Sequence, residues 1–257
     1  MGQDRHRLVD ERRNSHLHRA GSGGNVSAIS TAELNFVQIS DSHIGFNKPA
    51  NTDVVGTTRE AIMRINALPK TPEFLLHTGD LTHLTEPEQF DTLAQLLKEC
   101  RTKDVFYVPG EHDFYDNGEK YRERFGKNTT GAGWHSFDQK GVHFTGLVNV
   151  ANIQEGGLGT LGQEQLDWLE KDVKSLSTST PIVLFAHIPL WAVYPQWGWG
   201  TDDAERALSF VKRFGSVTVL NGHIRRSRRS PGSRDSRVPS RTDWLTRCRY
   251  WQAARLR

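Results

Sequence analysis

Five short apolar runs in this sequence each end directly in polar side chains that can bind a metal ion. The runs lie at residues 35–40, 74–77, 105–108, 182–186 and 217–220. The clusters that follow them are Asp41-Ser42-His43, Gly79-Asp80, Gly110-Glu111-His112-Asp113, Ala186-His187 and Gly222-His223. Because ligands of open α/β sheets bind outside the carboxyl ends of the strands, we expect these clusters to converge at one sheet edge.

Taken singly, each cluster has an ordinary explanation. An Asp after a strand commonly caps a helix, a Gly-Asp pair commonly forms a turn, and a buried His is more often a hydrogen-bonded core residue than a ligand. The ordinary explanation requires five coincidences in one register. The metal-binding interpretation is therefore preferred.

The segments between the apolar runs predict helices. Residues 57–68, 87–100, 162–176 and 202–214 space their apolar side chains three and four apart. A further apolar run at residues 142–148 follows Gln139-Lys140-Gly141, which is typical of a hairpin turn. This alternation predicts an α/β fold of layered β-sheets flanked by helices, with mostly parallel strands.

Charge is distributed unevenly along the chain. The net charge is +3, but eleven arginines against two aspartates give residues 225–257 a charge of +9, which leaves −6 for the remainder. The body is therefore acidic, and we expect nucleic acid to bind only through the basic tail, if at all. Residues 1–32 are polar and rich in Gly and Ser, which predicts a flexible leader. We expect the domain at residues 33–224.

Cysteine content and hydropathy exclude several classes of protein. Cys100 and Cys248 are too few for a disulfide framework. No apolar run reaches the roughly 20 residues that span a bilayer, and the N-terminal segment has no apolar core for a secretory signal. We expect no membrane segment and a cytoplasmic or undetermined location, and the oligomeric state stays open.

Taken in order, the clusters resemble the pattern of the calcineurin-like metallophosphoesterase family. That pattern is DxH, GD, GNH with Asp or Glu, a lone His, and GHxH; the matching stretches here are DSH, GDLT, GEHD, AHIP and NGHIR. The resemblance covers about residues 34–224. It implies the family's layered fold and the hydrolysis of a small phosphoester at a pair of metal ions, but it leaves monoesters and diesters equally open.

The resemblance also implies a role for each matching residue. Two divalent ions are expected, with these ligands: Asp41 and His43 for one, Glu111, His187 and His223 for the other, and Asp80 for both. Carboxylates and imidazoles without thiolates suit Mn, Fe or Zn. His112 is implied to protonate the leaving group, and Asp113 to orient the His112 ring.

Two positions depart from the family pattern. Glu111 replaces an Asn, which adds a negative charge and leaves less positive charge for an anionic substrate. Arg225 stands where the last His of GHxH belongs, so the site of Asp41 and His43 is expected to keep only three protein ligands. Beyond residue 225 we find no strand-like run, whereas the resemblance implies further strands. The C-terminal strands are therefore expected to be incomplete.

These departures leave other interpretations open. One is an inactive member of the fold that acts as an interaction protein, which Arg225 supports. Another is a nucleic-acid binder or nuclease that depends on the tail. We further hypothesise that residues 225–257 are a stretch read in a shifted frame, because the pattern is lost abruptly there; a disordered basic tail is the ordinary alternative.

The loop after His187 carries four aromatic side chains among Pro and Gly: Trp191, Tyr194, Trp197 and Trp199. Such side chains can stack on a nucleotide or a phenolic ester. They more often pack a long loop against its own domain, and this explanation is slightly preferred.

Overall fold

The computed structural model describes residues 33–153, 157–192 and 198–224, together with the backbone of residues 247–253. The described residues all belong to one compact unit, which spans Ala32–Arg257. The predicted leader at residues 1–32 lies outside the described residues. None of the helices in the described part of the chain is long and apolar enough to cross a bilayer.

The first sheet has the strand order β3-β2-β1-β8. Its strands are β1 (Leu34–Ser40), β2 (Phe74–Thr78), β3 (Val105–Val108) and β8 (Arg247–Ala253). β1, β2 and β3 run parallel, and β8 runs antiparallel to β1. β1 and β2 are buried along their whole length, as is typical of parallel strands that are covered on both faces.

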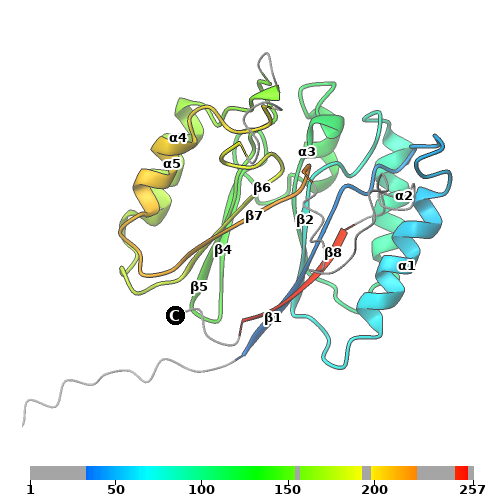
Figure 1. Cartoon of the computed structure of the whole chain (residues 1–257), viewed down its shortest axis with the longest axis horizontal. Coiled ribbons are helices and arrows are strands. Elements are labelled where there is room, and N and C mark those ends of the chain that lie inside the picture. Colours follow the sequence, from blue (N-terminus) through cyan, green and yellow to red (C-terminus); the bar gives the residue numbers. More distant parts are fainter. Residues whose placement is uncertain (1–32, 154–156, 193–197, 225–246, 254–257) are drawn as a thin grey trace, which may run out of the picture. The chain divides into compact units, whose positions relative to one another are not determined.

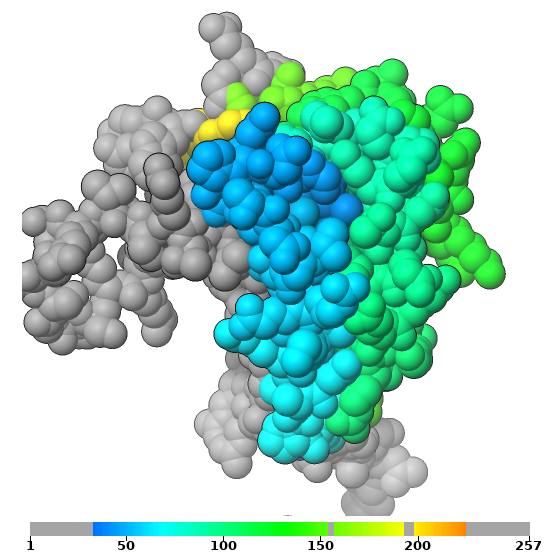
Figure 2. Space-filling model, turned by 90° about the vertical axis from the view of Figure 1, so that its right-hand side faces the viewer, coloured from blue at the N-terminus to red at the C-terminus, as the bar shows by residue number. Residues whose placement is uncertain are grey.

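Two helices cover one face of this sheet, α1 (Val54–Asn66) and α2 (Pro87–Leu97). α1 begins where the Asp53 side chain accepts a hydrogen bond of 2.7 Å from the backbone N–H of Gly56. α2 begins with Pro at its first helical position, where the missing N–H costs no hydrogen bond. Figure 2 shows this face, with α1 in blue to cyan beside α2 in teal.

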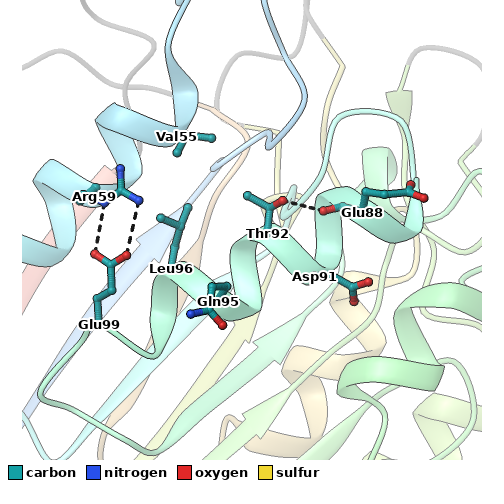
Figure 3. Close-up of a pocket in the computed structure, with 8 residues that line it drawn as sticks. All are labelled: Val55, Arg59, Glu88, Asp91, Thr92, Gln95, Leu96 and Glu99. Carbon is teal, nitrogen blue, oxygen red and sulfur yellow. Dashed lines mark hydrogen bonds and ion pairs between the residues drawn. The ribbon is translucent and has the colours of Figure 1, made fainter.

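A hollow on the surface lies along these two helices (Figure 3). Arg59 of α1 and Glu99, just after α2, form a two-pronged ion pair across it, with N···O distances of 3.2 and 3.4 Å. None of the predicted site residues lines this hollow. It is therefore separate from the edge where the strands end.

The second sheet has the strand order β4-β5-β6-β7. Its strands are β4 (His135–Gln139), β5 (Val142–Gly146), β6 (Ile182–Ala186) and β7 (Val217–Asn221). β4 and β5 form the predicted hairpin, whose turn residues Lys140 and Gly141 both have positive φ, as a two-residue turn requires. β5, β6 and β7 are parallel.

The second sheet carries its own helices, α4 (Gln163–Lys174) and α5 (Ala204–Val211). Their apolar sides pack with residues of β6, such as Leu184, in one core cluster. A short 3₁₀ turn, η1 (Glu111–Asp113), and α3 (Glu119–Phe125) connect β3 to β4.

A largely aromatic core joins the two sheets. Phe36 and Phe74 of the first sheet stack at 5.1 Å between ring centroids, and Phe144 of the second sheet meets both edge-on at 5.5 and 5.2 Å. The result is four layers in the order helices, sheet, sheet, helices (Figure 1). The predicted α/β layered fold is confirmed.

The C-terminal segment departs from expectation. Residues 247–253 form β8, which pairs with all seven residues of β1, so the expectation of no strand-like run beyond residue 225 is wrong at this point. β8 pairs with β1 through backbone hydrogen bonds along the free edge of β1. Such pairing leaves no signal in the side-chain pattern of the sequence. Residues 225–246 lie outside the described residues.

Candidate metal centre

The loops after the parallel strands bring the six predicted ligands together at one edge of the sheets. Their possible ligand atoms form two groups, each within 4.8 Å: a four-residue group of Asp80, Glu111, His187 and His223, and a three-residue group of Asp41, His43 and Asp80. Asp80 belongs to both groups and is only 2% exposed. Its carboxylate therefore has the position that a bridging ligand needs.

Four of these residues have left-handed backbone conformations that side chains rarely adopt. The φ angle is +59° at Asp41, +43° at His43, +52° at Asp80 and +60° at His223. Such strain costs on the order of 1–3 kcal/mol per residue and clusters at functional sites. Backbone hydrogen bonds hold the first loop in place: Asp41 N–H donates to Gly79 O at 3.0 Å, and His43 N–H donates to Asp80 O at 2.9 Å.

Two glycines let ligand side chains approach the backbone closely. A Cβ at Gly79 would collide with the His187 ring, and a Cβ at Gly110 would collide with the Asp80 carboxylate. Gly79 also has a φ of +91°, whereas the φ of Gly110 is an ordinary −101°. Gly110 is therefore needed for space rather than for backbone freedom.

The four-residue group is tightly connected. His187 Nε2 lies 2.9 Å from Glu111 Oε2 and 3.3 Å from Asp80 Oδ2, and His223 Nδ1 lies 2.9 Å from Glu111 Oε1. His187 Nδ1 contacts the carbonyl oxygen of Thr78 at 2.7 Å. Because a carbonyl only accepts hydrogen bonds, Nδ1 carries the proton and Nε2 faces the carboxylates, as in metal-binding histidines.

The charges of this group shift its pKa values strongly. Burial opposes ionisation of Glu111 and Asp80, but the neighbouring imidazoles, His187 foremost, outweigh burial and hold both pKa values below their usual range. Burial likewise opposes the charge on His187, yet Asp80 and Glu111 outweigh it and raise the pKa of His187 well above its ordinary value. The site therefore gathers ionised carboxylates that demand positive charge.

Unpartnered buried atoms show that a cation fits here. Asp41 Oδ1 accepts a hydrogen bond from His223 N–H at 3.1 Å, but Asp41 Oδ2 is buried without a partner. Glu111 Oε2 also makes no hydrogen bond, although His187 is at ion-pair distance. Each unpartnered buried atom costs roughly 1–3 kcal/mol. Oxygen and imidazole donors without thiolate suit Mn, Fe or Zn.

Asp113 does not orient the His112 ring, contrary to expectation. Its carboxylate accepts hydrogen bonds from the backbone N–H groups of Leu81, Thr82 and Gly110 at 2.7–2.9 Å, and from the Thr82 hydroxyl at 2.8 Å. Burial and the charge of Asp80 raise the pKa of Asp113 to about 7 against these donors. Asp113 thus ties together the loops that carry Asp80 and Glu111.

His83 and Tyr115 contact His112 instead, and neither residue was predicted to lie at the site. His112 Nδ1 lies 2.8 Å from the carbonyl oxygen of His83 and 2.9 Å from the hydroxyl of Tyr115. The His83 and His112 rings stack with centroids 4.8 Å apart. His83 comes three residues after Asp80 in the same loop, so its place in the sequence was the only available signal.

The loop after His187, which carries the aromatic residues, also contacts the site. The Trp199 ring packs on His223 with centroids 4.1 Å apart, and Trp199 has a φ of +50°. This contact agrees with the expectation that the aromatic residues pack against their own domain. Trp191 is 55% exposed, while Tyr194 and Trp197 lie outside the described residues.

The three-residue group has one side chain fewer than the four-residue group. Arg225, which stands in the sequence where the resemblance implies a further His, lies outside the described residues. Even without Arg225, the described residues give the two groups unequal numbers of possible ligands.

Comparison with known proteins agrees with this geometry. A 3',5'-cyclic-nucleotide phosphodiesterase of Nostoc sp. is 25% identical over 204 residues, which cover 74% of this chain and 71% of that protein. A probable glycerophosphodiester phosphodiesterase, GpdQ of Arcobacter nitrofigilis, is 28% identical over 170 residues. This match covers 60% of the chain, and the chain spans only 56% of that relative's length.

Solved structures share the fold. The purple acid phosphatase PPD1 of yellow lupin (Lupinus luteus) seeds superposes with a TM-score of 0.58 at 16% identity, over 76% of this chain and 38% of that chain. The sequence pattern of the calcineurin-like phosphoesterases matches residues 34–226, which is more than half of the protein. The chain therefore belongs to the calcineurin-like phosphoesterase family.

Proposed function

We propose that this protein hydrolyses phosphoesters with water at a pair of divalent metal ions. One observation carries the proposal: the buried Asp80 carboxylate belongs to two adjacent ligand groups that also hold unpartnered carboxylate oxygens. A bridging carboxylate keeps two like-charged ions close, as two-metal hydrolases require.

Each ligand group is assigned one ion. Asp41, His43 and Asp80 would hold the first, and Asp80, Glu111, His187 and His223 would hold the second. Mn, Fe and Zn all suit this donor set. When bound, the ions supply positive charge to the phosphoryl oxygens and activate a water for attack on phosphorus.

The protein's own residues handle the leaving group. The water oxygen bonds to phosphorus, the ester P–O bond breaks, and the departing oxygen takes a proton from His112. The attacking water loses one proton, and a proton returns to His112 before the next turnover, so the reaction as a whole consumes one water molecule. Because the His83 carbonyl accepts a hydrogen bond from His112 Nδ1, the donated proton comes from Nε2, so His112 acts in its doubly protonated form.

The names of the two relatives favour a diester over a monoester substrate. Both carry the name of a phosphodiesterase, in the second case as a probable one. A diester carries one negative charge less than an ionised monoester. The three carboxylates Asp41, Asp80 and Glu111 therefore repel a diester less than a monoester.

A second function is favoured by one observation. The three-residue group is short of a ligand, so an inactive member of the fold that serves as an interaction protein is the alternative.

We also propose that residues 225–257 are a shifted-frame product. Coding DNA with a neighbouring frame that continues through a His codon into alternating apolar residues would support it, and three frames without these would refute it.

Metal analysis of the purified chain tests the main proposal. The chain is stripped with a chelator, reloaded with Mn or Zn, and assayed with bis(4-nitrophenyl) phosphate and 4-nitrophenyl phosphate. We expect two equivalents of bound metal and hydrolysis that disappears on chelation and returns on reloading. A folded chain that binds two ions without hydrolysing either ester supports the interaction protein, and one that binds none refutes both metal assignments.

A further inference from the structure

Three histidine rings crowd together beside the metal centre, and only one of them is needed as a ligand there. One nitrogen each of His43, His83 and His112 lies within 4.8 Å of the other two. The His112 ring is 4.8 Å from both neighbours, and the His43 and His83 rings are 5.7 Å apart. His83 has no place in the proposed mechanism beyond its carbonyl group. Its ring therefore calls for a separate explanation.

The orientation of these rings disfavours a third metal ion. The His83 and His112 rings are nearly parallel, with an interplanar angle of 22°. The lone pairs of ring nitrogens lie in the ring plane, so those of two stacked rings run side by side and do not converge on one point. His112 Nδ1 is also occupied by the His83 carbonyl and the Tyr115 hydroxyl. The three rings therefore suit separate hydrogen bonds from their open nitrogens better than shared coordination of one ion.

His83 is held rigidly but leaves one nitrogen open. Its backbone N–H donates to Ile44 O at 2.9 Å and to the Gln89 side chain at 3.1 Å, and Phe46 packs edge-on against its ring at 5.0 Å. Its Nδ1 is buried without a partner, whereas Nε2 is not among the buried unpartnered atoms and makes no hydrogen bond within the described residues. Nε2 is therefore the atom that a ligand can reach.

The spacing of the stacked His83 and His112 rings fits two neighbouring oxygens of one ligand. When His112 faces the ester oxygen, a second oxygen bonded to His83 lies close beside the first. The two oxygens of a vicinal diol stand about one hydrogen-bond length apart, roughly 2.9 Å in a staggered gauche rotamer. The stacked His83 and His112 rings have centroids 4.8 Å apart, so one hydrogen bond from each ring reaches such a pair.

We infer that His83 binds the leaving group of the substrate, and that this leaving group is an alcohol with a hydroxyl on the carbon next to the ester carbon. This specificity rests on the proposed phosphoester hydrolysis. It restricts the substrate class to esters of vicinal diols, such as those of polyols and sugars.

Two symmetric diesters of matched size test the assignment. Bis(2-hydroxyethyl) phosphate places a hydroxyl where dipropyl phosphate places a methyl group, and in each diester both possible leaving groups are the same. With the Mn-loaded full chain, we expect kcat/KM to favour the hydroxyl ester about tenfold, the effect of one hydrogen bond. His83→Phe keeps a stacking ring but loses the nitrogen, and should bring the ratio close to one.

Two further variants separate binding from structure. His83→Gln restores a side-chain donor and should recover part of the preference. Leu84→Ala alters the exposed neighbouring residue and should keep the full preference. Thermal unfolding of each variant identifies any that fails to fold. In that event the Gln variant decides, because a folded Gln variant with a lower KM for the hydroxyl ester than for the propyl ester sustains the assignment.

Failure of this inference and failure of the proposed function give different results. Hydrolysis of bis(4-nitrophenyl) phosphate, which has no such hydroxyl, tests the proposed function alone. If the parent chain hydrolyses no ester, the same two dialkyl phosphates are compared by calorimetric binding, and equal Kd values overturn the inference. A hydroxyl preference that His83→Phe leaves intact also overturns it. So does a third equivalent of Mn that is lost in His83→Phe.

Discussion

Two buried histidines in this protein each lie between two carboxylates, yet their surroundings differ. His143 on β5 lies 2.9 Å from Asp138 and 2.9 Å from Asp172, and His187 after β6 lies 3.3 Å from Asp80 and 2.9 Å from Glu111. Carboxylate hydrogen bonds raise the pKa of His143 against the effect of burial, as the carboxylates do for His187.

The difference lies in the remaining atoms. Around His143, Asp172 accepts further hydrogen bonds from Ser136 at 2.7 Å and Thr145 at 3.4 Å, and no buried polar atom of these residues is unpartnered. Around His187, Glu111 Oε2 has no hydrogen-bond partner, and a third carboxylate, Asp41, is close by. A buried His–carboxylate pair is therefore not itself the mark of a metal site. The two surroundings differ instead in the carboxylate oxygens that are left unsatisfied, which are the atoms that a cation would bind.

The largest expected effect comes from Asp80, which serves both ligand groups. Asp80→Asn should release both ions and reduce hydrolysis by more than the roughly 10–100-fold loss that follows when a partner behind a ligand is removed. Metal content and turnover of bis(4-nitrophenyl) phosphate are the measurements. Asp167→Asn, at an exposed aspartate of α4, is the matched control. Unchanged metal content in a folded Asp80→Asn chain would refute the bridging role.

His112 extends the comparison to an imidazole whose Nδ1 partners are neutral oxygens. His112→Ala should lower kcat by on the order of 10²–10⁴ for alkyl esters, because they need a proton on the departing oxygen, and by less for nitrophenyl esters. Metal content should stay at the parent value. Equal losses for alkyl and nitrophenyl esters would argue against proton donation.

A smaller effect is expected at the three-residue group. If Arg225 stands where a fourth ligand belongs, Arg225→His should tighten the weaker metal by about tenfold, because an imidazole replaces a cation near a dication. Competition with a chromogenic chelator measures both affinities. A folded variant whose two affinities match those of the parent would remove Arg225 from the site.

The smallest effect on the metal centre is expected at His143, and it should appear in stability instead. The folded pKa of His143 is raised above its unfolded value near 6.5, so its stabilising charge is fully present below pH 6.5 and is lost as the pH rises through the folded value. His143→Gln should cost about 1–3 kcal/mol at pH 6 and less at pH 9. Urea unfolding at both pH values measures this, with metal content as the control. A pH-independent cost would contradict a charged His143.

Much of the site could be predicted because strand ends obey a topological rule. Parallel strands deliver the residues after them to one edge, so Asp41, Asp80 and His223 were found from the apolar runs that precede them. The hairpin at Lys140-Gly141 followed from local turn chemistry in the same way. Such inferences need only the neighbouring residues in the sequence.

Other features depend on contacts between distant segments. Asp113 follows His112 directly, yet its carboxylate is bound by the loop around Thr82, and no local pattern distinguishes that choice from a contact with the ring. His83 was not singled out, because only the folded loops bring its ring beside His112. β8 escaped prediction because an edge strand is selected through backbone hydrogen bonds, which every sequence offers.

The pairing of β1 with β8 has a consequence for synthesis of the protein. Leu34 pairs with Ala253 and Ser40 with Arg247, so the first strand of the described fold is completed by a strand more than 200 residues later in the sequence. Contacts so distant in sequence close late, because a long loop must be ordered first. During translation the outer edge of β1, one residue from Asp41, stays unpaired until the ribosome has released residues 247–253. Until then a nascent chain is open to pairing with other strands next to its proposed metal ligands.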